Sequence, residues 1–207
     1  MREVRVNTTA SGIPFVVVDD FFNQYEANLI LEELEFIRPH FEGPGGSGGA
    51  ANPDGSTKKN NNSLWLSHFF ANPNVSKICE LTRQFYDPEF VSALCEEHWI
   101  FKHLSVLPIA DAIQLLYYEQ SSTYDTHHDT AFLTYLYWTH KTPKKFEGGD
   151  ILLEEDTKVE FKANRLLIFP SITPHRVTPV RMQEKAEGYG RYCVSNFLHQ
   201  QTLANKN

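Results

Sequence analysis

The sequence contains only three cysteines, Cys79, Cys95 and Cys193, and they lie far apart in the chain. Because no Cys-x-x-Cys pair occurs, a structural zinc knuckle is disfavoured. A sparse and odd number of cysteines is typical of proteins from a reducing compartment. We therefore expect a cytoplasmic protein.

Long hydrophobic runs are absent as well. No uninterrupted apolar stretch reaches the ~18 residues that a membrane-spanning helix needs. The N-terminal stretch MREVRVNTTASG lacks the apolar region of a signal peptide. Positive charge is scarce too, because the formal net charge is −7 and no long basic stripe occurs. We expect neither a membrane nor a nucleic-acid partner.

Hydrophobic and aromatic residues, in contrast, are well represented, at 41% and 13% of the chain. This composition argues against disorder and favours strands around a packed interior. A chain of 207 residues fits one domain with a sizeable core. We expect a single domain over residues 1–207, with a helical and strand support region over 1–100 and a β-rich core over 101–200.

The first hundred residues carry signals for one strand and several helices. The run IPFVVVDDFF is rich in β-branched and aromatic residues and predicts a strand. Asn23 and Glu26 have the spacing of a capping box, so a helix should begin there and end near Pro39. A second helix is expected to open at Asn72 and Pro73, and the run DPEFVSALCEEHW predicts a short third one.

Residues 41–62, FEGPGGSGGAANPDGSTKKNNN, are rich in Gly, Asn and Ser. Such a composition buries little, so it predicts a mobile loop. Two interpretations stay open: a tolerated surface insertion, or a lid over an active site, since long loops in compact domains are often functional.

From about residue 100 the pattern changes to short apolar or alternating runs separated by turn-like segments. Seven such runs predict a sandwich, barrel or jelly roll with the helices packed on it. The runs are AIQLLYYEQ, AFLTYLYWTH, GDILLEE, KVEFK, NRLLIFPS, HRVTPV and RYCVSNFLHQ.

The stretch YDTHHDTAF places two histidines beside an aspartate. Side chains alternate between the faces of a strand, so His127 and Asp129 should share a face and His128 should point away. His175, between two predicted strands, is the best third ligand. Two histidines and a carboxylate on one face of a metal are typical of non-heme Fe(II) oxygenases. Zinc with the same ligands is an alternative.

Residues 113–198 resemble the prolyl-4-hydroxylase-type branch of the Fe(II)- and 2-oxoglutarate-dependent oxygenases. Tyr118 and Tyr124 precede the His-x-Asp pair, as in that family. A strand, a Gly-Gly strand and an apolar strand ending in Phe-Pro then follow in the family's order. The matching segments are FLTYLYW, EGGDILLEE, NRLLIFPSITPH, HRVTPV and GYGRYCVSNF.

The resemblance implies a double-stranded β-helix core, mainly β with N-terminal helices and cupin-like. It implies that His127, Asp129 and His175 bind Fe(II) and that Arg191 pairs with the distal carboxylate of 2-oxoglutarate. A planar, permanently charged guanidinium suits that role. Arg191 and His175 open strands that we interpret as hairpin partners, so the two residues should lie close together. Tyr118 would bond or enclose the co-substrate.

The sequence departs from the family pattern in three places. Arg191 lies further beyond His175 than is usual, so Arg181 and Lys185 stay open as alternative carboxylate ligands. Trp138 stands where the family often has Tyr, and its indole offers a hydrogen-bond donor without a hydroxyl. Thr134 or Tyr137 could share that role. The turn between Tyr118 and Tyr124 also lacks the usual Gly.

The resemblance further implies oxidative decarboxylation of 2-oxoglutarate with O2, giving succinate, CO2 and an oxidised substrate, with ascorbate as an optional reductant. Hydroxylation of an aliphatic C–H, in a prolyl residue of a peptide or protein, is the leading interpretation, and desaturation uses the same ligands. A free amino acid or small metabolite is the alternative substrate. A non-catalytic cupin-like metal-binding module is an alternative of another class. Oligomeric state is left open.

Overall fold

The computed structural model describes residues 4–106, 109–182, 184 and 186–200. Its helices are α1 (Gln24–Ile37), α2 (Leu66–Phe69), α3 (Lys77–Thr82), α4 (Pro88–Glu97) and α5 (His103–Val106). Its strands are β1 (Arg5–Thr8), β2 (Pro14–Val18), β3 (Asn62–Trp65), β4 (Ile109–Tyr118), β5 (Tyr124–His127), β6 (Leu133–Thr139), β7 (Phe146–Glu147), β8 (Ile151–Leu153), β9 (Thr157–Val159), β10 (Arg165–Pro170), β11 (His175–Val177), β12 (Arg181–Met182) and β13 (Arg191–Gln200).

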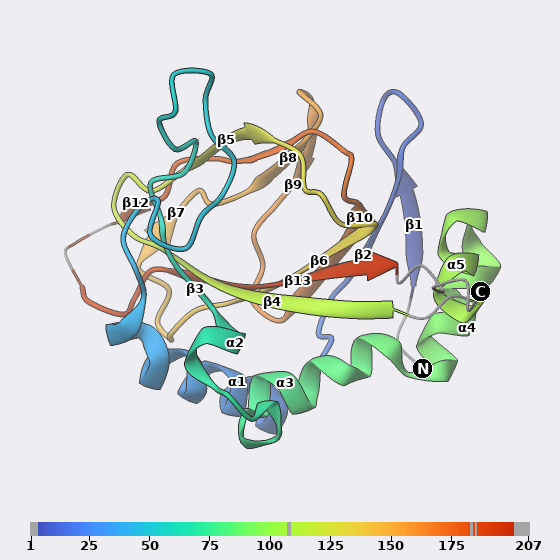
Figure 1. The fold of residues 1–207 in the computed structure, drawn as a ribbon, viewed down its shortest axis with the longest axis horizontal. Coiled ribbons are helices and arrows are strands. Elements are labelled where there is room, and N and C mark those ends of the chain that lie inside the picture. The colour runs from blue at the N-terminus through green and yellow to red at the C-terminus, as the bar shows by residue number, and fades with distance from the viewer. Residues whose placement is uncertain (1–3, 107–108, 183, 185, 201–207) are drawn as a thin grey trace, which may run out of the picture.

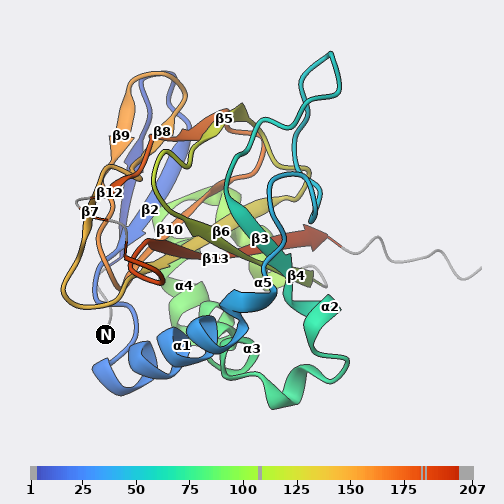
Figure 2. The ribbon, with the colours of Figure 1, turned by 90° about the vertical axis from the view of Figure 1, so that its left-hand side faces the viewer.

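Two antiparallel sheets form the body of the molecule. The larger has seven strands in the order β1-β2-β10-β6-β13-β4-β3, and the smaller has four in the order β5-β11-β8-β9. Figure 1 shows β5, β8 and β9 on one side of the large sheet and the helices α1 and α3 on the other. Figure 2 shows the same layers after a quarter turn. All seven strands that the alternating runs predict are present.

The core accordingly has two parts. One lies between the helices and the large sheet and contains Ile30, Leu34 and Phe85 together with Tyr137 of β6. The other lies between the two sheets and contains Leu116, Leu136 and Trp138 facing Ile151 and Val177. The second part surrounds the residues that the sequence singles out for metal binding.

Alternation along β6 explains how one strand serves both parts. Tyr137 packs edge-on against Phe22, with 5.0 Å between ring centroids, on the helix side. Trp138 faces the small sheet. The interpretation that Tyr137 shares the role of Trp138 is therefore wrong, because neighbouring strand residues point to opposite faces.

The helix signals are partly confirmed. Asn23 caps α1 and forms the reciprocal capping box with Glu26, and the helix ends just before the turn that contains Pro39. The second helix begins later than expected. Asn72 and Pro73 open a short 3-10 turn, and α3 starts at Lys77 with the Ser76 side chain as its cap.

The N-terminal hundred residues contribute more to the sheet than the sequence indicates. Besides the predicted β2, the short strands β1 and β3 form its two edges. Within the residues that the structure describes, no helix combines the length and apolar character needed to cross a bilayer.

Candidate metal centre and adjoining pocket

The strands β5 and β11 pair so that His127 lies directly opposite His175. Asp129 follows just beyond the end of β5, and its backbone N–H donates to the carbonyl of Ser171 (2.9 Å). One ligand atom from each of His127, Asp129 and His175 lies within 4.8 Å of the others. The structure thus brings the three predicted ligands together, although Asp129 reaches the site from an irregular segment rather than from a strand.

The imidazoles are oriented for metal binding. Nδ1 of His127 lies 2.8 Å from the carbonyl oxygen of Asp125, and Nδ1 of His175 lies 2.9 Å from that of Thr173. Because a carbonyl oxygen only accepts, both Nδ1 atoms carry the proton and donate. The Nε2 lone pairs face Asp129, whose carboxylate oxygens lie 3.8 Å and 3.6 Å away.

Burial keeps both rings uncharged. Loss of hydration lowers the pKa of His127 to about 3, with a further contribution from His175. Burial also lowers the pKa of His175, against the opposing attraction of Asp129. Two neutral imidazoles and a carboxylate are a donor set that Fe(II) and Zn2+ both accept. The residues therefore fit the implied metal.

Asp129 is held by a neighbouring hydroxyl. The Thr134 hydroxyl donates to Asp129 Oδ2 (2.7 Å) and lies 2.8 Å from the Ser171 hydroxyl. Thr134 is fully buried behind the carboxylate. This placement differs from a co-substrate contact, because the side chain supports a ligand of the metal instead of lining the pocket.

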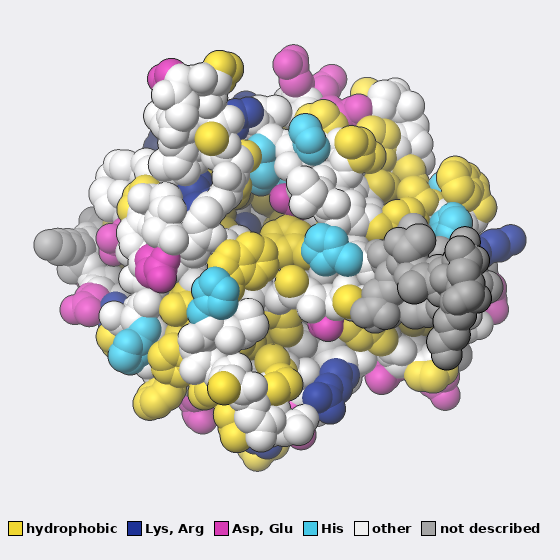
Figure 3. Space-filling model, viewed as in Figure 1, with side chains coloured by type: hydrophobic (Ala, Val, Ile, Leu, Met, Phe, Trp, Pro, Cys, Tyr) yellow, Lys and Arg dark blue, Asp and Glu magenta, His cyan; other side chains and the backbone are white. Residues whose placement is uncertain are grey.

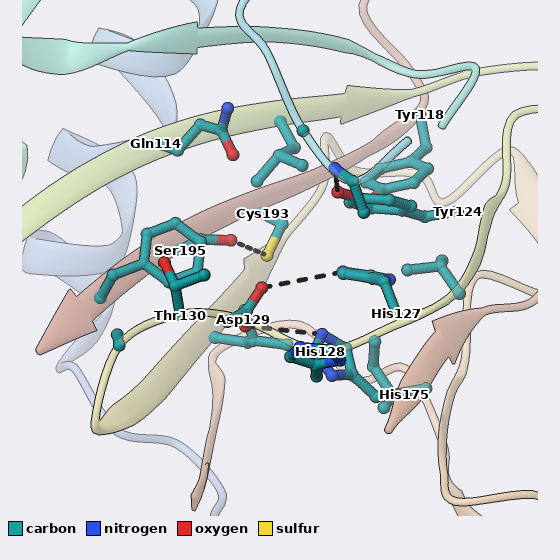
Figure 4. A pocket seen from close by; sticks show the side chains of 18 of the residues that line it. Gln114, Tyr118, Tyr124, His127, His128, Asp129, Thr130, His175, Cys193 and Ser195 are labelled. Atoms are coloured by element: carbon teal, nitrogen blue, oxygen red, sulfur yellow. Dashed lines mark hydrogen bonds and ion pairs between the residues drawn. The ribbon is translucent and has the colours of Figure 1, made fainter. Parts of the chain in front are cut away.

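A cavity of about 330 Å3 adjoins the three ligands. Its inner wall includes Tyr118 and Arg191, and the ring of Tyr124 stacks on that of His127 with 3.6 Å between centroids (Figure 4). On the face drawn in Figure 3, histidine and hydrophobic side chains gather around a hollow near the centre. His128 is exposed and lies at the edge of this cavity, whereas His127 is buried.

Arg191 is the most unusual side chain of the cavity. Its exposed fraction is 0%, and none of its three guanidinium nitrogens has a hydrogen-bond partner among the described residues. The guanidinium carbon lies 4.8 Å from the ring centroid of Tyr118 and 5.2 Å from that of Trp138. A buried cation without a partner carries a large desolvation cost, so this position is suited to bind an anion.

The predicted hairpin between the strands of Arg191 and His175 is wrong. β13 pairs with β4 and β6, whereas β11 pairs with β5 and β8. The two side chains line one cavity because their sheets face each other. The partners of β13 are strands far away in the sequence, so the local order of strands does not predict them.

Arg181 and Lys185 are the alternative cationic ligands that the sequence left open. Arg181 lies on β12, is exposed, and is not part of the cavity wall. Lys185 lies outside the described residues.

Gly149 keeps the space beside Arg191 open, since a Cβ there would lie 2.6 Å from Arg191 Cδ.

Two aromatic side chains flank the guanidinium. Tyr118 is 2% exposed, and burial raises the pKa of its phenol, with Arg191 acting in the opposite direction. It therefore remains a protonated donor. Trp138 is fully buried beneath Arg191 and stacks on Phe161 at 5.9 Å. Trp138 thus contacts the cation rather than the open cavity.

Sequence reasoning missed the contribution of residues 41–62. That segment was expected to bury little, yet Ser47, Lys59 and Asn61 are buried. Gly49 and Ala50 line the cavity, and the Ala50 N–H donates to the Tyr124 hydroxyl (3.0 Å). Polar composition hides this packing, because buried Lys59 and Ser47 bond each other instead of forming an apolar face.

Gln114 was also missed. It lines the cavity from β4 and is 6% exposed. A signal was present, since period-2 alternation places Gln114 on the same face as Leu116 and Tyr118. The sequence alone therefore contains enough information to identify Gln114 as a polar residue on the buried face of a predicted strand.

The comparison with protein families agrees with this geometry. Residues 113–199 match the family model described as the 2OG-Fe(II) oxygenase superfamily. A PKHD-type hydroxylase of Parvibaculum lavamentivorans is 32% identical over 103 residues, which cover 44% of this chain and 47% of that protein. Another from Gloeothece citriformis is 34% identical over 74 residues, covering 30% and 34%. The chain thus spans less than half the length of these curated relatives.

Solved structures show the same fold at low identity. A Pseudomonas putida prolyl-4-hydroxylase aligns with a TM-score of 0.55 and 14% identity over 91% of this chain and 93% of its own. The viral collagen prolyl hydroxylase of Paramecium Bursaria Chlorella virus-1 gives 0.54 and 15% over 91% and 96%. The α-ketoglutarate-dependent epimerase SnoN from nogalamycin biosynthesis gives 0.54 and 13% over 89% and 76%.

These likenesses confirm the predicted double-stranded β-helix. The family model, which matches residues 113–199, confirms the resemblance predicted for residues 113–198.

Proposed function

We propose that this protein is an Fe(II)- and 2-oxoglutarate-dependent dioxygenase that hydroxylates an aliphatic C–H, in a prolyl residue of a peptide or protein. The observation that carries the proposal is the unpartnered, fully buried guanidinium of Arg191 in the cavity that also holds His127, Asp129 and His175. A metal-binding module without turnover would have no need for a buried anion receptor, so this observation disfavours the non-catalytic alternative.

In this proposal the metal ligands and Arg191 have separate roles. His127, Asp129 and His175 hold Fe(II). When bound, iron, O2 and 2-oxoglutarate supply the oxidant, with release of succinate and CO2. Arg191 binds the distal carboxylate of 2-oxoglutarate, because a fixed guanidinium fork matches a carboxylate bidentately.

The supporting side chains act on these groups. Tyr118 and Trp138 enclose the guanidinium and exclude water, which strengthens its interaction with an anion. Thr134 holds Asp129 in place. A carboxylate at this position of the ligand set favours hydroxylation over halogenation, for which related enzymes carry a small residue. Ascorbate is a candidate reductant for the metal.

The proposal also identifies the class of substrate. The curated relatives are named PKHD-type hydroxylases, and two structural neighbours are prolyl hydroxylases. These names support a prolyl substrate. The same chemistry on a free amino acid or small metabolite is the second candidate, since SnoN, an epimerase from nogalamycin biosynthesis, shares the fold.

The test of the activity is formation of succinate. Protein supplied with Fe(II), ascorbate and 2-oxoglutarate should release succinate slowly without substrate, and His127→Ala should abolish this. A protein that neither binds 2-oxoglutarate nor converts it would refute the enzyme proposal. A prolyl peptide library, scored for a mass gain of one oxygen atom, then tests the substrate. A mass loss of two hydrogens would indicate desaturation instead.

A further inference from the structure

Gln114 presents an oriented hydrogen-bond acceptor to the cavity. Its Nε2 lies 3.4 Å from the Ser47 carbonyl oxygen and 3.2 Å from the Ser47 hydroxyl. Because a carbonyl oxygen only accepts, the amide nitrogen of Gln114 must face Ser47. Figure 4 shows the amide oxygen directed inward, toward the side of the pocket where Ser195 and Cys193 lie.

A buried network enforces this orientation. The Trp65 indole N–H also donates to the Ser47 carbonyl (2.9 Å). The Lys59 ammonium, 1% exposed, donates to the hydroxyls of Ser47 (3.0 Å) and Ser63 (2.8 Å), which bond each other. Turning the Gln114 amide over would bring two carbonyl oxygens together. The acceptor therefore faces the cavity before any ligand arrives.

The cavity wall supplies little charge for a substrate. Among its described residues, Asp129 and Arg191 are the only Asp, Glu, Lys or Arg side chains. Both are already assigned, one to the metal and one to the co-substrate. His128 and His199 lie exposed at the mouth. A zwitterionic ligand would bury an ammonium and a carboxylate without partners, which is costly.

We propose that Gln114 is a substrate-binding and specificity-determining residue. Its side-chain carbonyl accepts a hydrogen bond from an uncharged amide N–H next to the reacting residue. The site therefore takes amide-linked residues, as in a peptide, and rejects free amino acids. This inference rests on the proposed dioxygenase function and identifies the substrate class of the same cavity.

The test measures binding without turnover. Protein loaded with Mn2+ and 2-oxoglutarate is titrated calorimetrically with three probes. N-acetylglycyl-L-proline N-methylamide is neutral and carries amide N–H groups, N-acetylsarcosyl-L-proline N,N-dimethylamide is neutral and has none, and free L-proline is a zwitterion. Wild-type protein should bind the first about three- to tenfold more tightly than the second, the usual effect of one neutral hydrogen bond. Free L-proline should bind most weakly.

The variant Gln114→Leu should lose this preference. It should bind both neutral probes equally, with the affinity that the wild type has for the N–H-free probe, which also shows that the variant is folded. Gln24→Leu, at the exposed start of α1, is the matched control and should behave as wild type.

Three results would each overturn the inference: a preference that survives in Gln114→Leu, tighter binding of free L-proline than of the neutral probes, or no binding of any probe. Succinate formation separates these failures from failure of the proposed function. A protein that makes succinate but shows no Gln114-dependent preference refutes only the inference, whereas one that makes none refutes the proposed function.

Discussion

The four-stranded and seven-stranded sheets contribute different chemistry to one cavity. The small sheet brings His127 and His175 together through a single strand pair. The large sheet contributes Arg191 and Tyr118, which face each other in the β13–β4 pair, and Gln114 further along β4. The small sheet thus supplies neutral metal ligands, and the large sheet supplies the cation and the polar group that select what binds beside the metal.

Because the two sheets hold different groups, metal binding and ligand binding can be disrupted separately. Loss of a residue on the small sheet should abolish metal binding and everything that depends on it. Loss of Arg191 or Gln114 on the large sheet should leave the metal bound and change only the ligand beside it. The following predictions test this separation.

The largest effect is expected for Asp129→Ala and His127→Ala. Removing one of three ligands should weaken Mn2+ or Fe(II) binding by more than about a hundredfold, since even outer partners of metal ligands are worth about 10–100-fold. Metal titration followed by calorimetry measures this. His128→Ala is the matched control, because that exposed neighbour should leave metal affinity unchanged. Equal loss in all three variants would contradict the assignment.

The next effect concerns the cation. Arg191→Met should weaken 2-oxoglutarate binding by about two to four orders of magnitude, because loss of one partner of a buried charge pair costs about 3–5 kcal/mol. Metal affinity should be retained. Arg181→Met, on the exposed β12, is the control. If Arg181→Met shows the loss and Arg191→Met does not, the carboxylate receptor has been assigned to the wrong residue.

The same variant should have the opposite effect on the ligand-free protein. Arg191 is buried with no hydrogen-bond partner among the described residues, so Arg191→Met should raise the melting temperature when no anion is present. Saturating 2-oxoglutarate should stabilise the wild type and not the variant. Thermal unfolding with and without 2-oxoglutarate measures both. A variant that melts below the wild type in the absence of ligand would argue against an uncompensated charge.

A smaller effect is expected for Thr134, a residue of β6 in the large sheet whose hydroxyl bonds the metal ligand Asp129. Thr134→Val keeps the shape and removes the hydroxyl that donates to Asp129. Metal affinity should fall about 10–100-fold, as for other groups that orient metal ligands. Thr139→Val, on the same strand, is the control. An unchanged affinity would mean that the backbone alone positions Asp129.

The smallest effect is a pH dependence in the network beneath Gln114. Burial lowers the pKa of Lys59 to about 8 from its usual 10.5, against the attraction of Glu42. Between these values the unfolded state binds more protons, so the free energy of unfolding contributed by Lys59 rises with pH. Lys59→Met should therefore be stabilised relative to wild type at pH 7, by a few kcal/mol at most since each pKa unit is worth about 1.4 kcal/mol.

That advantage should shrink as the pH rises from 8 to 10.5. Urea unfolding at several pH values measures it, and Lys58→Met is the matched lysine substitution. A difference between wild type and Lys59→Met that stays constant across this range would show that Lys59 does not titrate in the folded protein.

Much of this organisation could be read from local pattern. Alternation predicted the strands, and the Asn23 capping box predicted the start of α1. His127 and Asp129 lie close together as predicted, although Asp129 lies just beyond the end of β5 instead of within the strand. The predicted proximity holds because residues two apart in the sequence can bring their side chains together both within a strand and just beyond its end.

Other features lay beyond local pattern. Arg191 was interpreted as a hairpin neighbour of His175, whereas distant strands in the two sheets bring the residues to one cavity. The buried role of Lys59 and Ser47 was hidden by a loop-like composition, because their burial depends on contacts with Ser63 and Gln114 rather than on hydrophobicity.

Which residues share a face of a strand, and where α1 begins, follow from the sequence, because backbone alternation and capping are local effects. The sequence therefore carried the ligand set and the candidate cation. Which strands pair depends on the tertiary structure, and that pairing buries Arg191 with no hydrogen-bond partner among the described residues and turns the Gln114 oxygen inward. Those properties depend on desolvation and on groups far apart in the chain, and they exist only when the two sheets face each other.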